Sequence, residues 1–422
     1  MIRQNFNADW TVEKGDGNSR MNSFLGNTQT KTVHLPYDAM IHEARTPDTK
    51  NGAQTGFYPG GEYIFQKHFT APQAWQGKPV SLVFEGVYQT ALVYLNGWLL
   101  TRNVNGYAEF TVEAGPYLKY GADNLLKVIA DNSLEPNSRW YTGSGIYRPV
   151  RLLVGNKVYL PQDTVRITTR EADEGFALLD VTAQVQSAST VTERVTLQQT
   201  ICREGTAVLT DRQNLLLQPG ESRIVSFRYC VDSPALWSPE NPNLYTSTMQ
   251  VLEGEEELDR EETSFGIRTL SIDASHGVRI NGQTVKLRGA CIHHDNGILG
   301  AATLPDAEER RIRQLKEAGF NAIRSSHHPA GRALLDACDR YGVLVMDELS
   351  DVWNVRKNPY DYALYFEQDW KPTIQKMVAK DYNHPSVILY CVGNEISEAG
   401  SESGAETNRR LCNCLLYTSD AA

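Results

Sequence analysis

The sequence predicts a multidomain protein in which a jelly-roll β-sandwich and an immunoglobulin-like β-sandwich precede the first half of a (β/α)8 TIM barrel. Short apolar runs broken by Gly and Asn continue to about residue 153, and closely spaced turns separate further runs up to about residue 268. Both patterns are typical of antiparallel sandwiches. Beyond residue 271 strands alternate with helices, which indicates a parallel sheet built from about four βα units.

Length and composition indicate an ordinary globular protein with room for several domains. The 422 residues are 41% hydrophobic and 22% charged, and the net charge is −10. An acidic balance without a Lys/Arg cluster argues against a nucleic-acid or anionic-membrane partner, so we expect a neutral small molecule as ligand. No apolar stretch approaches the roughly 20 residues that span a bilayer, and no signal-peptide pattern opens the chain, so a cytoplasmic location is expected. The seven cysteines show no metal-ligand spacing and are predicted to be reduced thiols.

Residues 1–157 are predicted to form the jelly roll. Its apolar runs include residues 80–85 and 91–95, and Asn96 and Gly97 after the second run are typical of a hairpin turn with positive φ at both central residues. Residues 138–148 combine aromatic residues and Arg with Gly. That composition suits a loop that reaches over another domain's cleft, and it suits equally well a core turn of the sandwich itself.

Residues 158–270 are predicted to form the immunoglobulin-like sandwich, with strands such as 178–183 and 224–229. The acidic run at residues 255–257 is interpreted as a solvated hairpin tip. Because no chemical motif occurs in this region, the domain is expected to act as a spacer.

Residues 271–411 are predicted to form the N-terminal half of the barrel, with strands at 285–291, 321–325, 343–347 and 387–392. Asp306 and Glu309 predict a capping box at the start of the first helix, and Gly319 predicts its end. The last strand is an unbroken apolar run, as in a strand buried on both faces of a parallel sheet.

Residues 412–422 are interpreted as a foreign or out-of-frame tail, because they neither extend the preceding helix sensibly nor begin a fifth strand. A half-barrel leaves strand edges and a large apolar face exposed. We therefore expect the barrel segment not to close and to be degraded by proteases, whereas the two sandwiches fold on their own cores.

Polar side chains follow all four predicted barrel strands, at the edge where TIM barrels carry their catalytic groups. They are His293, His294 and Asp295 after the first strand, His327 and His328 after the second, Asp347, Glu348, Asp351 and Trp353 after the third, and Asn394 and Glu395 after the fourth. Imidazoles, an amide, carboxylates and an indole around one pocket suit a sugar, whose hydroxyls they bind and whose ring they stack on. Adjacent His residues point in different directions in extended chain, which argues against a dedicated zinc site.

Several ordered motifs resemble those of glycoside hydrolase family 2, the family of β-galactosidases, β-glucuronidases and β-mannosidases. The resemblance covers nearly the whole chain up to about residue 411. The motifs lie at residues 139–148, 236–245, 265–268, 288–295, 299–302, 321–327, 346–348 and 393–395.

This resemblance implies a retaining double displacement with two carboxyl groups. Glu395 matches the general acid/base and is expected to be partly buried, so that it holds its proton at neutral pH. Asn394 matches the residue that binds the sugar 2-hydroxyl. The other implied substrate-binding residues are His293, His327, Asp351, Trp353, Arg139 and Trp140. The nucleophilic Glu of the family belongs to a later strand, so the 422-residue polypeptide alone is expected to be inactive.

The resemblance favours an exo-acting β-galactosidase, with a β-glucuronidase or another family 2 β-glycosidase as the alternative within the enzyme class. A non-catalytic carbohydrate-binding protein is the alternative from a different class. Metal-dependent members place Glu and His shortly after the Asp-Glu pair, whereas this chain has Val352 and Asn354. No metal and no cofactor are therefore expected, magnesium included. The expected partner is a β-glycoside or oligosaccharide substrate, and a homo-oligomeric full-length form is compatible with the family.

Overall fold

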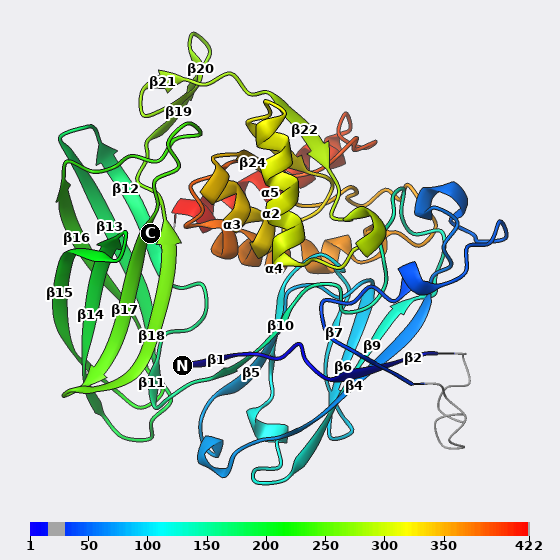
Figure 1. Ribbon diagram of the computed structural model, residues 1–422, viewed down its shortest axis with the longest axis horizontal. Coiled ribbons are helices and arrows are strands. Elements are labelled where there is room, and N and C mark those ends of the chain that lie inside the picture. The colour runs from blue at the N-terminus through cyan, green and yellow to red at the C-terminus, as the bar shows by residue number, and fades with distance from the viewer. Residues whose placement is uncertain (16–29, 421–422) are drawn as a thin grey trace.

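The computed structural model describes residues 1–15 and 30–420, so residues 421–422 of the predicted tail lie outside it. Figure 1 shows a blue and cyan sandwich at the lower right, a green sandwich at the left, and yellow to red helices around a short sheet between and above them. In the described residues no helix is long and apolar enough to cross a membrane.

The first sandwich consists of two antiparallel sheets whose strand orders are β1-β10-β5-β8 and β3-β2-β4-β9-β6-β7. Burial alternates residue by residue along β9, so one face of that strand meets the core. Trp10, Phe65 and Phe84 are fully buried at the centre of this core. The strands are β1 (Ile2–Asn5), β2 (Trp10–Lys14), β3 (Lys31–Val33), β4 (Gly61–Thr70), β5 (Val80–Phe84), β6 (Thr90–Leu95), β7 (Trp98–Asn103), β8 (Phe110–Glu113), β9 (Asp123–Asn132) and β10 (Val150–Val154).

The hairpin predicted between β6 and β7 is confirmed. Asn96 has a φ of 53° and Gly97 a φ of 88°, which is the left-handed conformation that Asn and Gly tolerate best.

The second sandwich also consists of two antiparallel sheets, β11-β13-β12 with β16 beside β13, and β15-β14-β17-β18. The expected strands lie within β13 and β16, and the acidic run begins with Glu255 in the turn after β17 and continues into the exposed start of β18. The strands are β11 (Val158–Tyr159), β12 (Arg166–Ala172), β13 (Phe176–Ser187), β14 (Glu193–Arg203), β15 (Thr206–Leu217), β16 (Ser222–Asp232), β17 (Tyr245–Glu253) and β18 (Glu256–Phe265). A hairpin sheet of β19 (Leu270–Asp273), β20 (Gly277–Ile280) and β21 (Gln283–Thr284) leads to the barrel segment.

The barrel segment is a parallel sheet in the order β22-β23-β24-β25. Within the described residues, β22 and β25 each pair on one side only. Apolar residues from α2, α3 and the strands form one core, which includes Ile312, Leu335 and Val345. The elements are β22 (Gly289–Ile292), α2 (Pro305–Glu317), β23 (Ala322–Ser325), α3 (Arg332–Tyr341), β24 (Leu344–Glu348), α4 (Phe366–Asp381), β25 (Val387–Cys391) and α5 (Glu402–Asp420).

Two local predictions in this segment are wrong. The first barrel strand begins at Gly289 instead of Val285, because Val285 N donates to Val278 O in the hairpin sheet and Arg288 N donates to the Asn321 side chain. The capping box at α2 is absent, because Pro305 occupies the first helical position and places Asp306 inside the helix.

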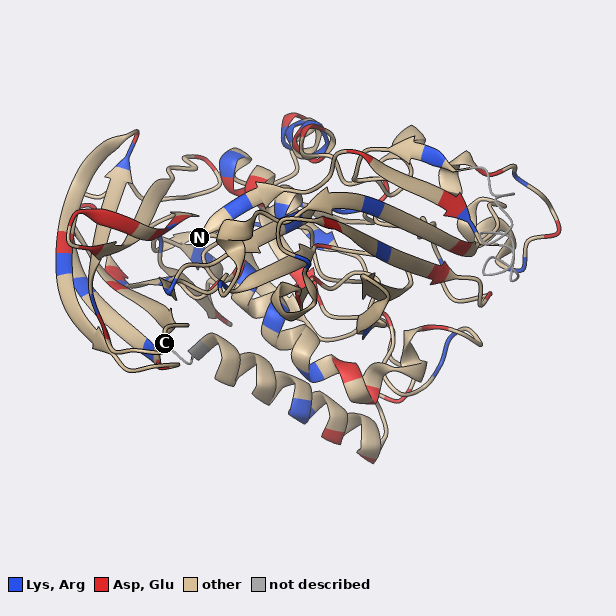
Figure 2. Cartoon of the chain, turned by 90° about the horizontal axis from the view of Figure 1, so that it is seen from below, with Lys and Arg blue, Asp and Glu red and all other residues tan. Residues whose placement is uncertain are grey.

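The prediction that residues 412–422 do not extend the helix is also wrong. Helix α5 continues through this segment and ends at Asp420. Leu411, Cys414 and Leu415 recur at helical spacing and pack against the α4 side chains Trp370 and Ile374, so the apolar stripe of α5 continues into this segment. Figure 2 shows α5 running towards the second sandwich, where Arg166 Nη1 donates to Thr418 O at 3.1 Å.

One ionic cluster joins the first sandwich, the second sandwich and the barrel segment. Arg332, the first residue of α3, donates to both carboxylate oxygens of Glu109 in the first sandwich, at 2.8 and 2.9 Å. Its Nη2 lies 2.5 Å from Asp163 Oδ2 in the second sandwich. Burial alone would raise the pKa of Glu109 and of Asp163, but the charge of Arg332 outweighs it and lowers both pKa values. This guanidinium is therefore one of the contacts that hold the two sandwiches and the barrel segment together.

Replacing Arg332 by Met is expected to lower the free energy of unfolding by about 3 kcal/mol, because the partly buried Asp163 loses its counter-charge and Glu109 keeps only its 3.3 Å ion pair with Arg151. Urea denaturation and calorimetry measure the change. The matched control is Arg313→Met on α2, whose 3.9 Å contact with Glu317 is solvent-exposed and stabilises little. An Arg332→Met protein as stable as the control would show that the cluster does not hold the bodies together.

Candidate active site

The expected constellation forms at the carboxyl edge of the parallel sheet. β22 ends just before His293, β23 ends two residues before His327, and β25 ends three residues before Asn394. Since the strands are parallel, these ends lie on the same side of the sheet.

A loop of the first sandwich closes over this edge. Arg139, between β9 and β10, donates to Asp351 from Nη2 at 2.7 Å and from Nε at 3.2 Å, and to Glu395 Oε2 from Nη1 at 3.1 Å. Later in the same loop Ile146 is fully buried in the sandwich core, and Tyr147 is fully buried where the sandwich meets Ala301 and His294 of the barrel segment. Both interpretations of residues 138–148 therefore hold, each for a different part of the loop.

A buried carboxylate fixes the path of this loop. Asp38 accepts hydrogen bonds from Tyr141 Oη at 2.6 Å, Ser144 N at 3.0 Å and, from the barrel segment, Ala301 N at 2.8 Å. Burial raises the pKa of Asp38 despite these donors. The loop is thereby tied to the segment that follows β22.

Trp140 packs against two of the predicted His residues. Its ring stacks on His293 with centroids 5.1 Å apart and an interplanar angle of 18°, and it meets His327 edge-on at 5.5 Å. Trp140 Nε1 donates to Tyr107 Oη at 3.0 Å. Burial lowers the pKa of His293, so this ring is held neutral beside the indole.

A chain of polar contacts orients the remaining groups. His327 Nδ1 lies 2.7 Å from Glu348 Oε1, and Arg324 Nε donates to Glu348 Oε2 at 2.5 Å. Arg324 Nη2 also donates to Asn394 Oδ1 at 3.1 Å, and Asn394 Nδ2 donates to Asp351 Oδ1 at 2.9 Å. Both ends of the Asn394 amide are thus fixed, which leaves one donor and one acceptor position for a ligand.

Asp351 is the most heavily bonded carboxylate of the site. Besides Arg139 and Asn394 it contacts Lys357, whose Nζ lies 2.9 Å from Oδ1. Burial alone would raise the pKa of Asp351, but these hydrogen bonds outweigh it and hold the pKa below the usual range. Asp351 is therefore an anion at neutral pH that links both halves of the site.

Glu395 differs from expectation. Its side chain is 70% exposed, so the partial burial predicted for it is not observed. The backbone of Glu395 turns into the left-handed region with a φ of 43°, and the carboxylate meets Arg139 at the rim of the site.

Trp353 lies in the core next to the site and is 3% exposed. Its Nε1 donates to Val392 O at 2.8 Å, so it supports the segment that leads to Asn394. A Cβ at Gly393 would lie 2.7 Å from this indole nitrogen, which explains why glycine is needed at this close approach.

A cavity of about 40 Å³ lies beneath Trp140, between loops of the first sandwich and the barrel segment; it is lined by Asn137, Asp361 and His328 among others. This volume suits a few water molecules and is too small for a pyranose.

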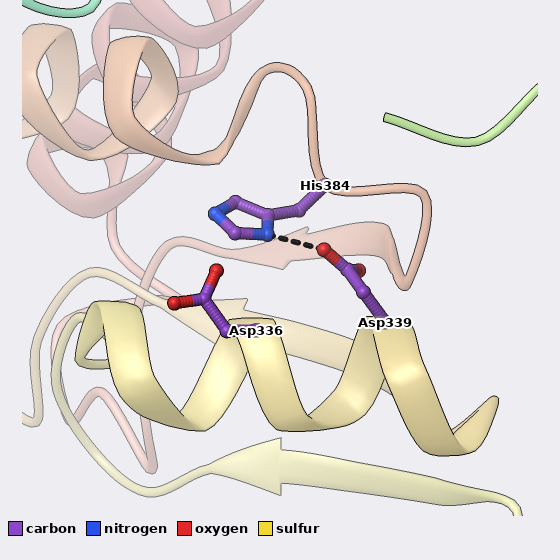
Figure 3. Close-up of side chains that lie close together, drawn as sticks. All are labelled: Asp336, Asp339 and His384. Carbon is purple, nitrogen blue, oxygen red and sulfur yellow. Dashed lines mark hydrogen bonds and ion pairs between the residues drawn. The ribbon is translucent and has the colours of Figure 1, made fainter. Parts of the chain in front are cut away.

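At the two positions that the resemblance compares with the magnesium ligands of metal-dependent members, the side chain of Val352 has no metal-binding atom and Asn354 Nδ2 lies 3.5 Å from Thr407 Oγ1. Elsewhere in the described residues, Asp336, Asp339 and His384 bring ligand atoms within 4.8 Å of one another (Figure 3). There His384 Nδ1 lies 2.5 Å from Asp339 Oδ2, and Ser386 N donates to Asp339 Oδ1 at 3.1 Å. These contacts tie α3 to the start of β25, at the opposite end of that strand from Glu395.

Three residues of the network were not among the predicted site residues: Arg324, Glu348 as a partner of His327, and Lys357. Arg324 and Glu348 lie inside motifs named above, whereas Lys357 lies in none of them. The partners of these residues are set by the tertiary fold. In the sequence, the alternation along β23 pointed to Arg324 and the end of the third strand pointed to Glu348.

Models of glycoside hydrolase family 2 match almost all of the chain. The "galactose-binding domain-like" model matches residues 10–176, the model described as "Glycosyl hydrolases family 2" matches 158–268, and the "TIM barrel domain" model matches 273–409. The chain belongs to glycoside hydrolase family 2.

Relatives and solved structures agree with this assignment. The β-galactosidase BoGH2A of Bacteroides ovatus is 37% identical over 96% of this chain and 48% of its own length. A protein of Formosa agariphila named a putative β-glucuronidase is 31% identical over the whole chain and 40% of its own length. A family 2 structure from Bacteroides cellulosilyticus superposes with a TM-score of 0.94 at 36% identity, covering 98% of this chain and 54% of that one. The chain spans about half the length of the curated relatives it matches.

The pH dependence of stability should report on the buried His294, whose Nε2 lies 2.9 Å from Thr142 O of the loop. Burial lowers the pKa of His294 to about 3, and Arg148 and Arg311 nearby oppose its protonation further. The unfolded chain binds this proton below about pH 6.5, so stability is present above that pH and declines as the pH falls towards 3.

Between pH 7 and pH 5 this proton is expected to account for a loss on the order of 2 kcal/mol. The variant His294→Gln, which keeps an N–H donor and removes the titration, should lose correspondingly less stability in urea denaturation at the two pH values. Equal losses in both proteins would show that His294 does not titrate on unfolding.

Proposed function

We propose that this chain carries the acid/base half of a retaining exo-β-galactosidase site. The observation that carries the proposal is the position of Glu395 at the carboxyl end of β25, next to the fixed amide of Asn394 and in contact with Arg139. A carboxyl at this position can protonate a departing glycosidic oxygen and later activate water.

A retaining mechanism needs a second carboxyl as nucleophile. In the described part of the site, the candidates Glu348 and Asp351 are both held by cations: Glu348 by Arg324, and Asp351 by Arg139 and Lys357. Neither is free to attack an anomeric carbon. We propose that the nucleophile is supplied by a barrel strand beyond β25 and that residues 1–422 alone show no turnover.

The remaining predicted residues are proposed to bind or support the sugar. Asn394 offers its second N–H and lone pair to the 2-hydroxyl, and His327, whose Nδ1 lies 2.7 Å from Glu348 Oε1, presents Nε2 to the sugar. Trp140 and His293 form an apolar wall, Arg139 and Asp351 border the opening, and Trp353 supports the backbone before Asn394.

The charges favour a neutral sugar over a uronic acid. A glucuronate carboxylate needs an available cation, whereas Arg139, Arg324 and Lys357 each pair with a carboxylate of the site in the described structure. Relatives named both β-galactosidase and β-glucuronidase occur, so β-glucuronidase is the alternative activity. A sugar-binding protein without catalysis is the alternative outside the enzymes. Because Val352 and Asn354 replace the usual ligands, we propose that the site works without magnesium.

Calorimetric titration of the 422-residue chain tests the sugar preference. Methyl β-D-galactoside is expected to bind more tightly than methyl β-D-glucuronide, and EDTA should not change its affinity. Asn394→Ala should weaken the galactoside at least about tenfold, because a buried polar partner loses its hydrogen bonds. The control Glu402→Gln at the start of α5 should leave the affinity unchanged.

Tighter binding of the glucuronide would contradict the proposed β-galactosidase activity and favour β-glucuronidase. Binding that Asn394→Ala does not affect would place the sugar outside this site.

A further inference from the structure

Lys357 joins two loops of the site through one ammonium group. Its Nζ donates to Asp351 O at 2.7 Å, to Asp351 Oδ1 at 2.9 Å and to Asn394 O at 2.6 Å. A lysine ammonium has three N–H donors, so all of them are used. Two of the three acceptors are backbone carbonyls, which a lysine present only to neutralise Asp351 would not need.

The loop that carries Lys357 is itself fixed. The backbone N–H groups of Lys357 and Asn358 both donate to Asp361 Oδ2 at 2.7 Å, and the Lys357 side chain is only 14% exposed. The ammonium is therefore preorganised and does not have to be ordered when a ligand arrives.

The carbonyl bound by Lys357 belongs to the peptide that joins Asn394 to Glu395. Glu395 has a φ of 43°, a conformation that is unfavourable for a residue with a Cβ and persists where the surroundings enforce it. The orientation of this peptide plane, together with φ of Glu395, decides where the Glu395 side chain departs from the backbone.

The same segment is held from a second side. Trp353 Nε1 donates to the carbonyl of Val392 at 2.8 Å, two residues before the carbonyl that Lys357 binds. Trp353 and Lys357 belong to the same loop after β24. That loop thus binds two carbonyls of the segment that follows β25, those of Val392 and Asn394, one on each side of Gly393.

We propose that Lys357 is the positioning residue of the acid/base: it holds the Asn394–Glu395 peptide in its left-handed turn and so sets the place of the Glu395 carboxyl, without touching the sugar. The inference rests on the proposed function for what Glu395 does, but the backbone geometry that Lys357 enforces is independent of it.

The test compares Lys357→Met and Lys357→Arg with the control Lys371→Met, an exposed lysine on α4, all in the 422-residue chain. Hydrogen exchange is measured across the chain, together with the indole N–H resonance of Trp353, the melting temperature and the affinity for methyl β-D-galactoside. In Lys357→Met, exchange should rise about 10- to 100-fold in residues 393–396 and in the loop around 351–353, because a charge-assisted hydrogen bond is lost from each. The Trp353 resonance should shift.

Lys357→Arg should not restore protection, since a planar guanidinium cannot direct donors at three oxygens around one point. The control should match the wild type in every readout. Loss of protection spread over the whole chain with a lowered melting temperature, or unchanged exchange at 393–396, would overturn the proposal. Absence of galactoside binding in the wild type would count against the proposed function alone, because the exchange result does not depend on the ligand.

Discussion

The site depends on the ion pair between Arg139 and Asp351, which come from different bodies of the molecule. Asp351 is largely buried and is paired with Lys357 of its own loop and with Arg139 of the first sandwich, so the Arg139 contact links that sandwich to the barrel edge. The other contacts of the opening accompany this link: Trp140 reaches His293 and His327, and Arg139 reaches Glu395. The first sandwich is thereby part of the site as well as a neighbour of it.

The rest of the fold maintains that link at a distance. Arg332 fixes both sandwiches to the start of α3, and Asp38 ties the loop to the segment after β22. On the barrel side, Arg324, Glu348 and Lys357 fix the amide of Asn394 and the peptide before Glu395. Such a division, with rigid strands below and cross-linked loops above, holds polar groups in place before a ligand binds.

The sequence-based predictions succeeded where a local pattern determines the structure. The turn at Asn96 and Gly97, the alternating strands and the strand-end positions of His293, His327, Asn394 and Glu395 follow from residue type and spacing. They failed at Arg288 and in α5 because a tertiary partner decides: Asn321 replaces the ladder at Arg288, and Leu411 continues the stripe of α5 against α4. The cap of α2 failed for a local reason, since Pro305 occupies the first helical position and places Asp306 inside the helix. The burial of Glu395 was mispredicted because it depends on which neighbours meet the strand end, and the cross-links by Arg324 and Lys357 join residues far apart in sequence.

The account's central claim is that Glu395 is the acid/base of a retaining glycosidase. The most direct measurement is the dependence of kcat on the leaving group for Glu395→Gln in a polypeptide that carries the whole barrel. Turnover of methyl β-D-galactoside, whose alkoxide must be protonated to leave, should fall by about 10²- to 10⁴-fold, whereas the formation of the glycosyl-enzyme from 2,4-dinitrophenyl β-D-galactoside should be largely retained. An equal loss on both substrates would contradict the assignment and leave Glu395 with a purely structural role.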